Sequence, residues 1–263
     1  DLLVNKSTPE QRENLDLSSW QVAFNGAEPV RWETLDRFAK TFEPHGFNRT
    51  ALFPCYGLAE SSVFVCGSRI GTLPVVKNFD KKALQRNQLV AAEKSDDANT
   101  LVGSGHFTGD QVVKIVDPET RLEVKNGEMG EVWVKGASVS RGYWNRKETS
   151  EKTFYNYIAD TEDGPYLKTE DRGFFVGDEL FIAGRIKDLI IIRGVNHYPQ
   201  DIERTVEVCH PSLRLGGGAA FSVEADGEEK LVIAHEIEFR QDPDIREVAA
   251  AMREVVAEQH DLQ

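Results

Sequence analysis

A change of pattern near residue 187 is the feature that most constrains what this sequence can fold into. From Gln111 onward, short apolar runs alternate with glycine-containing turns, a pattern typical of a β-meander. After residue 187 the pattern predicts a strand, a helix opened by Pro199, two strands and an amphipathic helix over 243–259. We therefore predict a domain boundary between 1–186 and 187–263, with a small α+β domain after it.

The first part of the chain is expected to be α/β. An apolar strand at 21–25 precedes a helix whose apolar residues share one face, and a second strand at 51–53 is expected to stop at Pro54. Residues 77–110 are polar and broken by Gly, Asn and Asp, which predicts a long surface insertion with one short helix near 81–85.

Composition excludes several classes of protein. The 263 residues carry 44 acidic and 31 basic side chains, a net charge of −13, which argues against a nucleic-acid binder. No apolar run approaches the ~18 residues of a transmembrane segment. The three cysteines show no metal-ligand spacing and fit a reduced, cytoplasmic compartment. The chain starts at Asp1 without a signal core, so we expect it to be a piece of a longer protein.

Two early loops carry residues suited to nucleotide chemistry. Gly26, Ala27 and Glu28 follow the first strand, and their small side chains leave room for a flat ring against the backbone. In the segment 56–61, YGLAES, Tyr56 is able to stack on a purine and Glu60 offers oxygen ligands for Mg²⁺. Taken singly, both loops also fit a plainer interpretation: a common turn, and a core tyrosine beside a surface glutamate.

Two later segments add to this set. Asp171, expected at a turn before an apolar strand, is able to accept two hydrogen bonds from a ribose diol, although an isolated Asp is also a common turn former. The string 184–203, GRIKDLIIIRGVNHYPQDIE, places Arg185 within reach of a sugar or phosphate and Lys187 where the pattern changes, a position suited to a hinge. An ordinary charged hairpin is the alternative for this string.

Together these four segments resemble the adenylate-forming superfamily. YGLAES, the following insertion and GRIKDLIIIRG with NHYPQDIE resemble the fatty acyl-AMP ligases within it. The resemblance implies part of a large domain with α/β and β-barrel parts, an insertion at about 70–104, and most of a small C-terminal domain. It further implies ATP and Mg²⁺ as cofactors, and a fatty acid and the phosphopantetheine arm of an acyl carrier protein as partners. The implied reaction forms acyl-AMP and pyrophosphate, then passes the acyl group to a carrier protein of a polyketide or nonribosomal peptide pathway.

The resemblance also assigns roles to single residues. Gly26, Ala27 and Glu28 line the adenine, Tyr56 stacks on it, and Gly57, Leu58 and Ala59 wrap the α-phosphate side. Glu60 binds Mg²⁺, Asp171 and Arg185 hold the ribose hydroxyls, and Lys187 is the hinge.

Four departures from the family pattern are visible, one of which is Val195 at a position where ligases of this type often carry a basic residue. Glu170 stands where the superfamily usually has Gly, which adds negative charge beside the nucleotide. The sequence contains neither a Gly/Ser/Thr-rich phosphate loop ending in Lys-Gly nor the lysine that the family places near its C-terminus. We therefore expect this chain alone to have little adenylation activity. An acyl-CoA synthetase and a non-catalytic adenylate-binding module are the alternatives.

Overall fold

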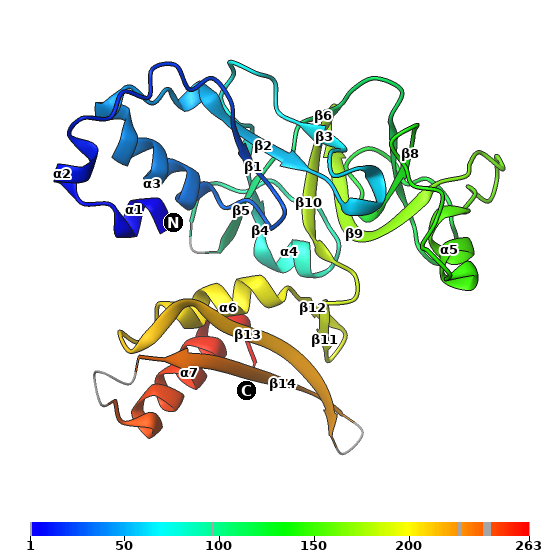
Figure 1. The fold of residues 1–263 in the computed structure, drawn as a ribbon. Coiled ribbons are helices and arrows are strands. Elements are labelled where there is room, and N and C mark those ends of the chain that lie inside the picture. The colour runs from blue at the N-terminus through cyan, green and yellow to red at the C-terminus, as the bar shows by residue number, and fades with distance from the viewer. Residues whose placement is uncertain (1, 96, 226–227, 239–242, 263) are drawn as a thin grey trace. The chain divides into compact units, whose positions relative to one another are not determined.

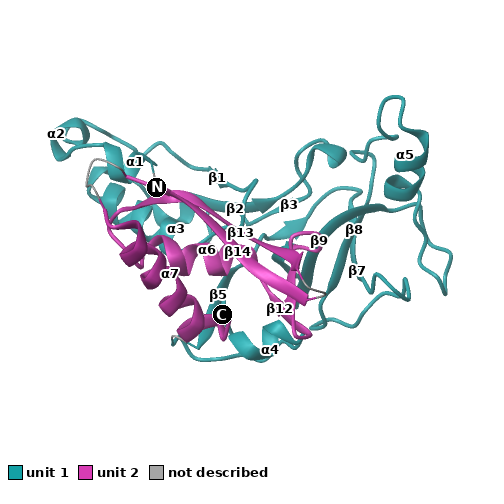
Figure 2. Cartoon of the chain, turned by 90° about the horizontal axis from the view of Figure 1, so that it is seen from below, with its two compact units in different colours: residues 1–184 teal, residues 185–263 magenta. Residues whose placement is uncertain are grey.

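The computed structural model describes residues 2–95, 97–225, 228–238 and 243–262 (Figure 1). The chain forms two compact units, residues 1–184 and 185–263 (Figure 2). Both mix helices with sheets, so the chain has the predicted mixed α/β architecture. Among the described residues, no helix is both long and apolar enough to cross a membrane.

The first unit opens with an α/β part. Helices α1 (Leu2–Lys6) and α2 (Pro9–Arg12) precede the parallel pair β1 (Ala23–Asn25) and β2 (Leu52–Tyr56), between which lies helix α3 (Trp32–Phe42). The apolar face of α3 buries Leu35, Ala39 and Phe42, as the 3.6-residue period predicts. Strands β3 (Cys66–Gly67) and β6 (His106–Phe107) complete the sheet in the order β1-β2-β3-β6. Three short 3₁₀ turns lie in the same part: Glu43–His45, Arg49–Ala51 and Ala59–Ser61.

Strand β2 runs through Pro54, so the expected stop at this proline is wrong. Pro54 is paired with Asn25, the last pair of the parallel ladder, and its carbonyl oxygen accepts a hydrogen bond from Ser68 N–H at 2.9 Å. A proline removes only its own N–H from a ladder, and a short strand tolerates that loss at the end of a pairing. The consequence is that Tyr56 is the last residue of a strand.

The insertion is more ordered than its composition suggested. Helix α4 (Lys81–Gln85) lies where it was predicted, but strands β4 (Val76–Asp80) and β5 (Ala98–Val102) pair as an antiparallel hairpin around it. Phe79 and Leu84 are buried against Phe174 and Phe181. Two apolar side chains that face one core thus anchor a segment that is polar elsewhere.

The second half of this unit is a four-stranded antiparallel sheet in the order β10-β9-β8-β7, at the place of the expected barrel part. Its strands are β7 (Val112–Val116), β8 (Gly130–Lys135), β9 (Leu167–Val176) and β10 (Glu179–Arg185), with helix α5 (Lys147–Phe154) before β9. All but the last residue of β8 are buried, so this strand forms the centre of the core.

The second unit contains the hairpin β11 (Ile190–Ile192) and β12 (Val195–His197), helix α6 (Pro199–Glu207), the long hairpin β13 (Leu213–Ala225) and β14 (Glu228–Ile237), and helix α7 (Ile245–His260). Ile190, Ile202, Val206 and Val248 are among the residues of its separate core. This element order matches the small α+β unit expected from the sequence except for β12, which lies in a segment expected to be a loop.

Candidate functional site

Tyr56 and Asp171 meet although 115 residues separate them in the chain. The Tyr56 hydroxyl donates a hydrogen bond to Asp171 Oδ2 at 2.6 Å, and Asp171 is 7 % exposed. Burial, followed by the Asp171 carboxylate, raises the pKa of Tyr56 well above its ordinary value. The phenol therefore stays protonated and donating, and the end of β2 is joined to the middle of β9.

Asp171 lies inside strand β9 and not at a turn, which corrects the sequence prediction. The β8–β9 pairing shifts register between Glu131 and Trp133, and Glu170 has a φ of 60°. Thr169 stabilises the irregularity: its hydroxyl donates to Val132 O at 2.7 Å and accepts from Asp171 N–H at 3.1 Å. Such a bulge re-aims a side chain within a continuous strand, and a sequence pattern does not distinguish it from a turn.

A left-handed backbone at Glu170 gives a physical reason for the glycine that the superfamily usually has at this position. Non-glycine residues adopt this region at a cost of about 1 kcal/mol. The Glu170 charge also acts on Tyr143, whose pKa it helps to raise.

The YGLAES segment forms a tight turn that requires Gly57. A Cβ atom on Gly57 would lie 1.6 Å from the carbonyl oxygen of Val63, a contact with backbone that cannot move aside. Leu58 and Ala59 lead from this turn into the 3₁₀ turn Ala59–Ser61, which carries Glu60. The close contact between Gly57 and the Val63 backbone therefore fixes the position of the turn that carries Glu60.

A second loop, residues 138–143, is hydrogen-bonded to the Glu60 turn at several points. Ser140 N–H donates to Glu60 O at 2.7 Å, and the Ser62 hydroxyl donates to Ser138 O at 2.8 Å. The buried Ser61 hydroxyl lies 3.1 Å from the Ser138 hydroxyl. Several hydrogen bonds therefore join these two segments, which are about 80 residues apart in the sequence.

Tyr143, the last residue of the 138–143 loop, also contacts the Glu60 turn, and the sequence analysis did not predict a role for it. Its hydroxyl donates to Glu60 Oε1 at 2.7 Å. Partial burial, followed by this hydrogen bond, raises the pKa of Tyr143 to about 12. No spacing rule connects positions 60 and 143, so the sequence held no signal for this contact.

The predicted adenine loop follows β1. Gly26, Ala27 and Glu28 are exposed, and Ala27 has a φ of 70°. A Cβ atom on Gly26 would lie 2.8 Å from the carbonyl oxygen of Cys55 in β2, so the loop passes close to the strand that ends in Tyr56. The parallel pairing of β1 and β2 places both strand ends at one edge of the sheet, where α/β proteins bind ligands.

Arg185 and Lys187 belong to the second unit, whose first residue is Arg185. Arg185 ends strand β10, and Lys187 follows two residues later. Their predicted roles at the ribose and as a hinge, and the proposed domain boundary at residue 187, stay predictions.

Glu60 is the candidate metal ligand. Within the described residues, no group of three or more His, Cys, Asp or Glu side chains is placed to hold a metal ion. A single carboxylate nevertheless suits Mg²⁺, which proteins bind through one or two carboxylates together with substrate phosphates and water. Within the same residues Glu60 Oε1 accepts from Tyr143, and no hydrogen bond is made to Oε2. The donor set therefore fits a magnesium ion carried by a nucleotide.

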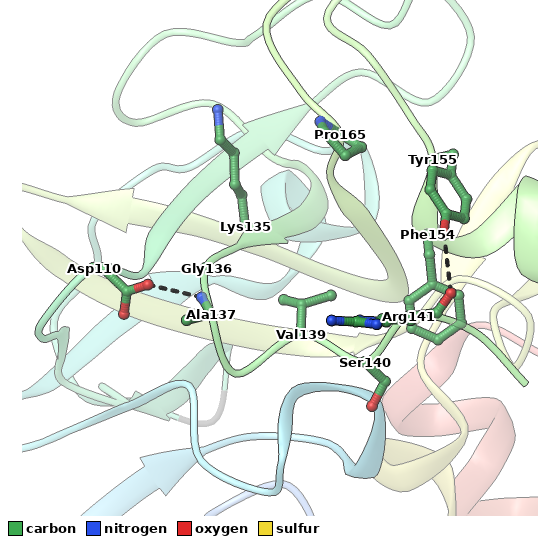
Figure 3. A pocket seen from close by; sticks show the side chains of 10 residues that line it. All are labelled: Asp110, Lys135, Gly136, Ala137, Val139, Ser140, Arg141, Phe154, Tyr155 and Pro165. Carbon is green, nitrogen blue, oxygen red and sulfur yellow. Dashed lines mark hydrogen bonds between the residues drawn. The ribbon is translucent and has the colours of Figure 1, made fainter.

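A pocket of about 440 Å³ is lined in part by residues of the 138–143 loop (Figure 3). Its walls are Asp110, Lys135, Gly136, Ala137, Val139, Ser140, Arg141, Phe154, Tyr155 and Pro165. None of the residues predicted to bind the nucleotide or the metal ion lines it. Ser140 connects it to the Glu60 turn, and Phe154 packs edge-on against Tyr143 with ring centroids 5.1 Å apart.

Comparison with protein-family models identifies the chain. A model described as AMP-binding enzyme matches residues 1–144, more than half of the sequence. The chain belongs to the AMP-binding enzyme family. A second model, the AMP domain of Disco-interacting protein 2-like proteins, matches residues 187–263.

Individual relatives of this AMP-binding chain are fatty-acid ligases. It is 48% identical over 265 residues to the medium-chain-fatty-acid–[acyl-carrier-protein] ligase JamA of Moorena producens, covering 99% of this chain and 45% of JamA. A structure from work on fatty acyl-adenylate ligases of E. coli and L. pneumophila superposes with a TM-score of 0.87 at 30% identity. The alignment covers all of this chain and 46% of that one.

A fatty acyl-adenylate ligase of L. pneumophila, in complex with acyl adenylate and pyrophosphate, gives a TM-score of 0.68 at 39% identity. That alignment covers 99% of this chain and 46% of the ligase. This AMP-binding chain thus spans about half the length of the relatives it matches.

Proposed function

We propose that this chain forms part of a fatty acyl-AMP ligase. The enzyme activates a fatty acid with ATP, releases pyrophosphate and transfers the acyl group from acyl-AMP to the phosphopantetheine thiol of an acyl carrier protein. The observation that carries the proposal is the Tyr56–Asp171 hydrogen bond, because it joins two of the four segments that the sequence predicts to bind the nucleotide. The identity of 48% to a fatty-acid–carrier-protein ligase supports the choice of substrates.

The proposed roles are those that the family resemblance implies, and the positions of the loops at the strand ends support them. Gly26, Ala27 and Glu28 form one side of the adenine site, and the Tyr56 ring forms its floor. Asp171 accepts a hydrogen bond from Tyr56 through Oδ2 and is proposed to hold the ribose diol as well, because a carboxylate accepts several hydrogen bonds at once.

The phosphate side of the site is assigned to the turn 57–60. Residues Gly57, Leu58 and Ala59 would wrap the α-phosphate side, and Glu60 would hold the nucleotide's Mg²⁺, whose charge would stabilise the phosphate oxygens during the reaction. Rigid support from the 138–143 loop keeps the carboxylate in place before the nucleotide arrives. Arg185 and Lys187 are proposed to contact the ribose and to act as the hinge.

Fatty-acid-dependent ATP–pyrophosphate exchange tests the first half-reaction in the enzyme that contains this chain at its natural length. We expect exchange with fatty acids and its loss, or a sharp rise in the KM for ATP, in Asp171→Ala. Absence of exchange with every chain length, in a protein that is folded by circular dichroism, would overturn the proposal.

The acceptor is tested separately. Purified acyl-AMP intermediate is offered either a holo carrier protein or coenzyme A, and the thioester products are separated by mass. Transfer to the carrier protein supports the proposal, whereas efficient transfer to coenzyme A alone would identify an acyl-CoA synthetase.

A further inference from the structure

Tyr143 is held in place at three separate points. Its backbone N–H donates to the Ser150 hydroxyl at 2.8 Å, its ring packs edge-on against the buried Phe154, and its hydroxyl donates to Glu60. Ser150 and Phe154 both belong to helix α5, so the orientation of Tyr143 is set by a regular element of the fold.

The backbone at Gly142 passes close to helix α5. Gly142 has a φ of 142°, and a Cβ atom there would lie 2.8 Å from Ser150 Cβ and Oγ. The Ser150 hydroxyl in turn donates to Arg146 O at 2.7 Å, and Ser150 is 8 % exposed. This leaves the Tyr143 backbone little freedom, which lowers the entropy lost when its side chain makes a hydrogen bond.

The hydrogen bond from Tyr143 makes the two oxygens of the Glu60 carboxylate inequivalent. Oε1 accepts from Tyr143 at 2.7 Å, and in the part of the chain that the structure describes no donor engages Oε2. A carboxylate fixed through one oxygen presents the other in a defined direction, which is how outer partners commonly orient metal-binding side chains.

We propose that Tyr143 is a positioning residue for the magnesium site: it fixes Glu60 through Oε1 so that Oε2 faces the nucleotide-bound cation. This inference rests on the proposed function of Glu60 and names a residue that the sequence resemblance did not assign. Partners of this kind change metal affinity about 10- to 100-fold when they are removed.

The test is calorimetric titration of ATP into the enzyme that contains this chain, without Mg²⁺ and at increasing Mg²⁺. Tyr143→Phe keeps the ring that packs on Phe154 and removes only the hydroxyl. We expect the Mg²⁺ concentration for half-maximal enhancement of ATP binding to rise about tenfold or more, with metal-free ATP binding unchanged. Tyr155→Phe is the matched control, because it removes a nearby hydroxyl that donates to Arg141 O at 3.1 Å. We expect it to leave the Mg²⁺ dependence unchanged.

The titration distinguishes a failure of the proposed Glu60 function from a failure of the proposed Tyr143 role. A wild-type protein whose ATP binding does not respond to Mg²⁺ would overturn the proposed function of Glu60. A Tyr143→Phe variant with the wild-type Mg²⁺ response would overturn the positioning role alone. An equal loss of metal-free and metal-dependent binding would reduce Tyr143 to a structural residue. The double variant Glu60→Gln/Tyr143→Phe should respond to Mg²⁺ as Glu60→Gln does, because a positioning residue acts only through its partner.

Discussion

Removing one oxygen atom from Tyr56 tests whether the β2–β9 contact stabilises the first unit. Tyr56→Phe keeps the ring but leaves the Asp171 carboxylate, which is 7 % exposed, without its 2.6 Å donor. A hydrogen bond to a charged group contributes about 1.5–3 kcal/mol. We therefore expect the free energy of unfolding of this unit to fall by about 2 kcal/mol.

Urea titration followed by tryptophan fluorescence measures this change selectively. All four tryptophans of the chain (Trp20, Trp32, Trp133 and Trp144) lie within residues 1–184, so the signal reports the unfolding of the first unit. The slope of the transition should stay constant, because the substitution leaves the surface exposed on unfolding nearly unchanged.

A double-mutant cycle with Asp171→Asn measures whether the loss of stability comes from the interaction between Tyr56 and Asp171. If the two side chains act together, the double variant should lose less stability than the sum of the single variants, with a coupling of about 1 kcal/mol or more. Tyr155→Phe serves as the control and should stay within about 0.5 kcal/mol of the wild type. A Tyr56→Phe variant that also stays within about 0.5 kcal/mol would refute the reasoning.

Four further outcomes are expected. Gly57→Ala should weaken ATP binding about tenfold or more, because the new methyl group meets backbone at 1.6 Å; unchanged calorimetric affinity would contradict this. Glu170→Gly should tighten ATP binding by up to about fivefold by removing a negative charge, and a looser complex would show that Glu170 assists the site. Phe79→Ala should destabilise the insertion by about 3–5 kcal/mol, seen as faster amide exchange in β4 and β5, whereas unchanged protection would mean that this ring does not anchor it. Burial lowers the pKa of His197, so the unfolded state binds more protons below pH ~6.5. The second unit should therefore lose stability as the pH falls below that value, and His197→Gln should remove this dependence in urea titrations followed by circular dichroism.

The sequence alone determined the elements with a strong period. Helix α3, helix α6 and helix α7 lie where their apolar spacing predicted them, because a 3.6-residue period has one simple solution, an amphipathic helix. The family was also readable, because four short strings, YGLAES and GRIKDLIIIRG among them, occur together in one chain, although each taken singly also fits a plainer interpretation.

The insertion shows where local reasoning fails. Its polar composition predicted a surface loop, yet β4 and β5 pair across the α4 region, and Phe79 is buried against β9 and β10. Pairing and burial of this kind depend on strands far along the chain, and composition carries no information about them.

Only the tertiary structure decided which candidate residues meet. It placed Tyr56 against Asp171 across 115 positions and Glu60 against Tyr143 across 83, and it put Asp171 in a bulged strand where a turn was expected. Periodicity describes which face of an element is buried, whereas these contacts depend on register shifts and left-handed residues, which arise when separate strands are packed together.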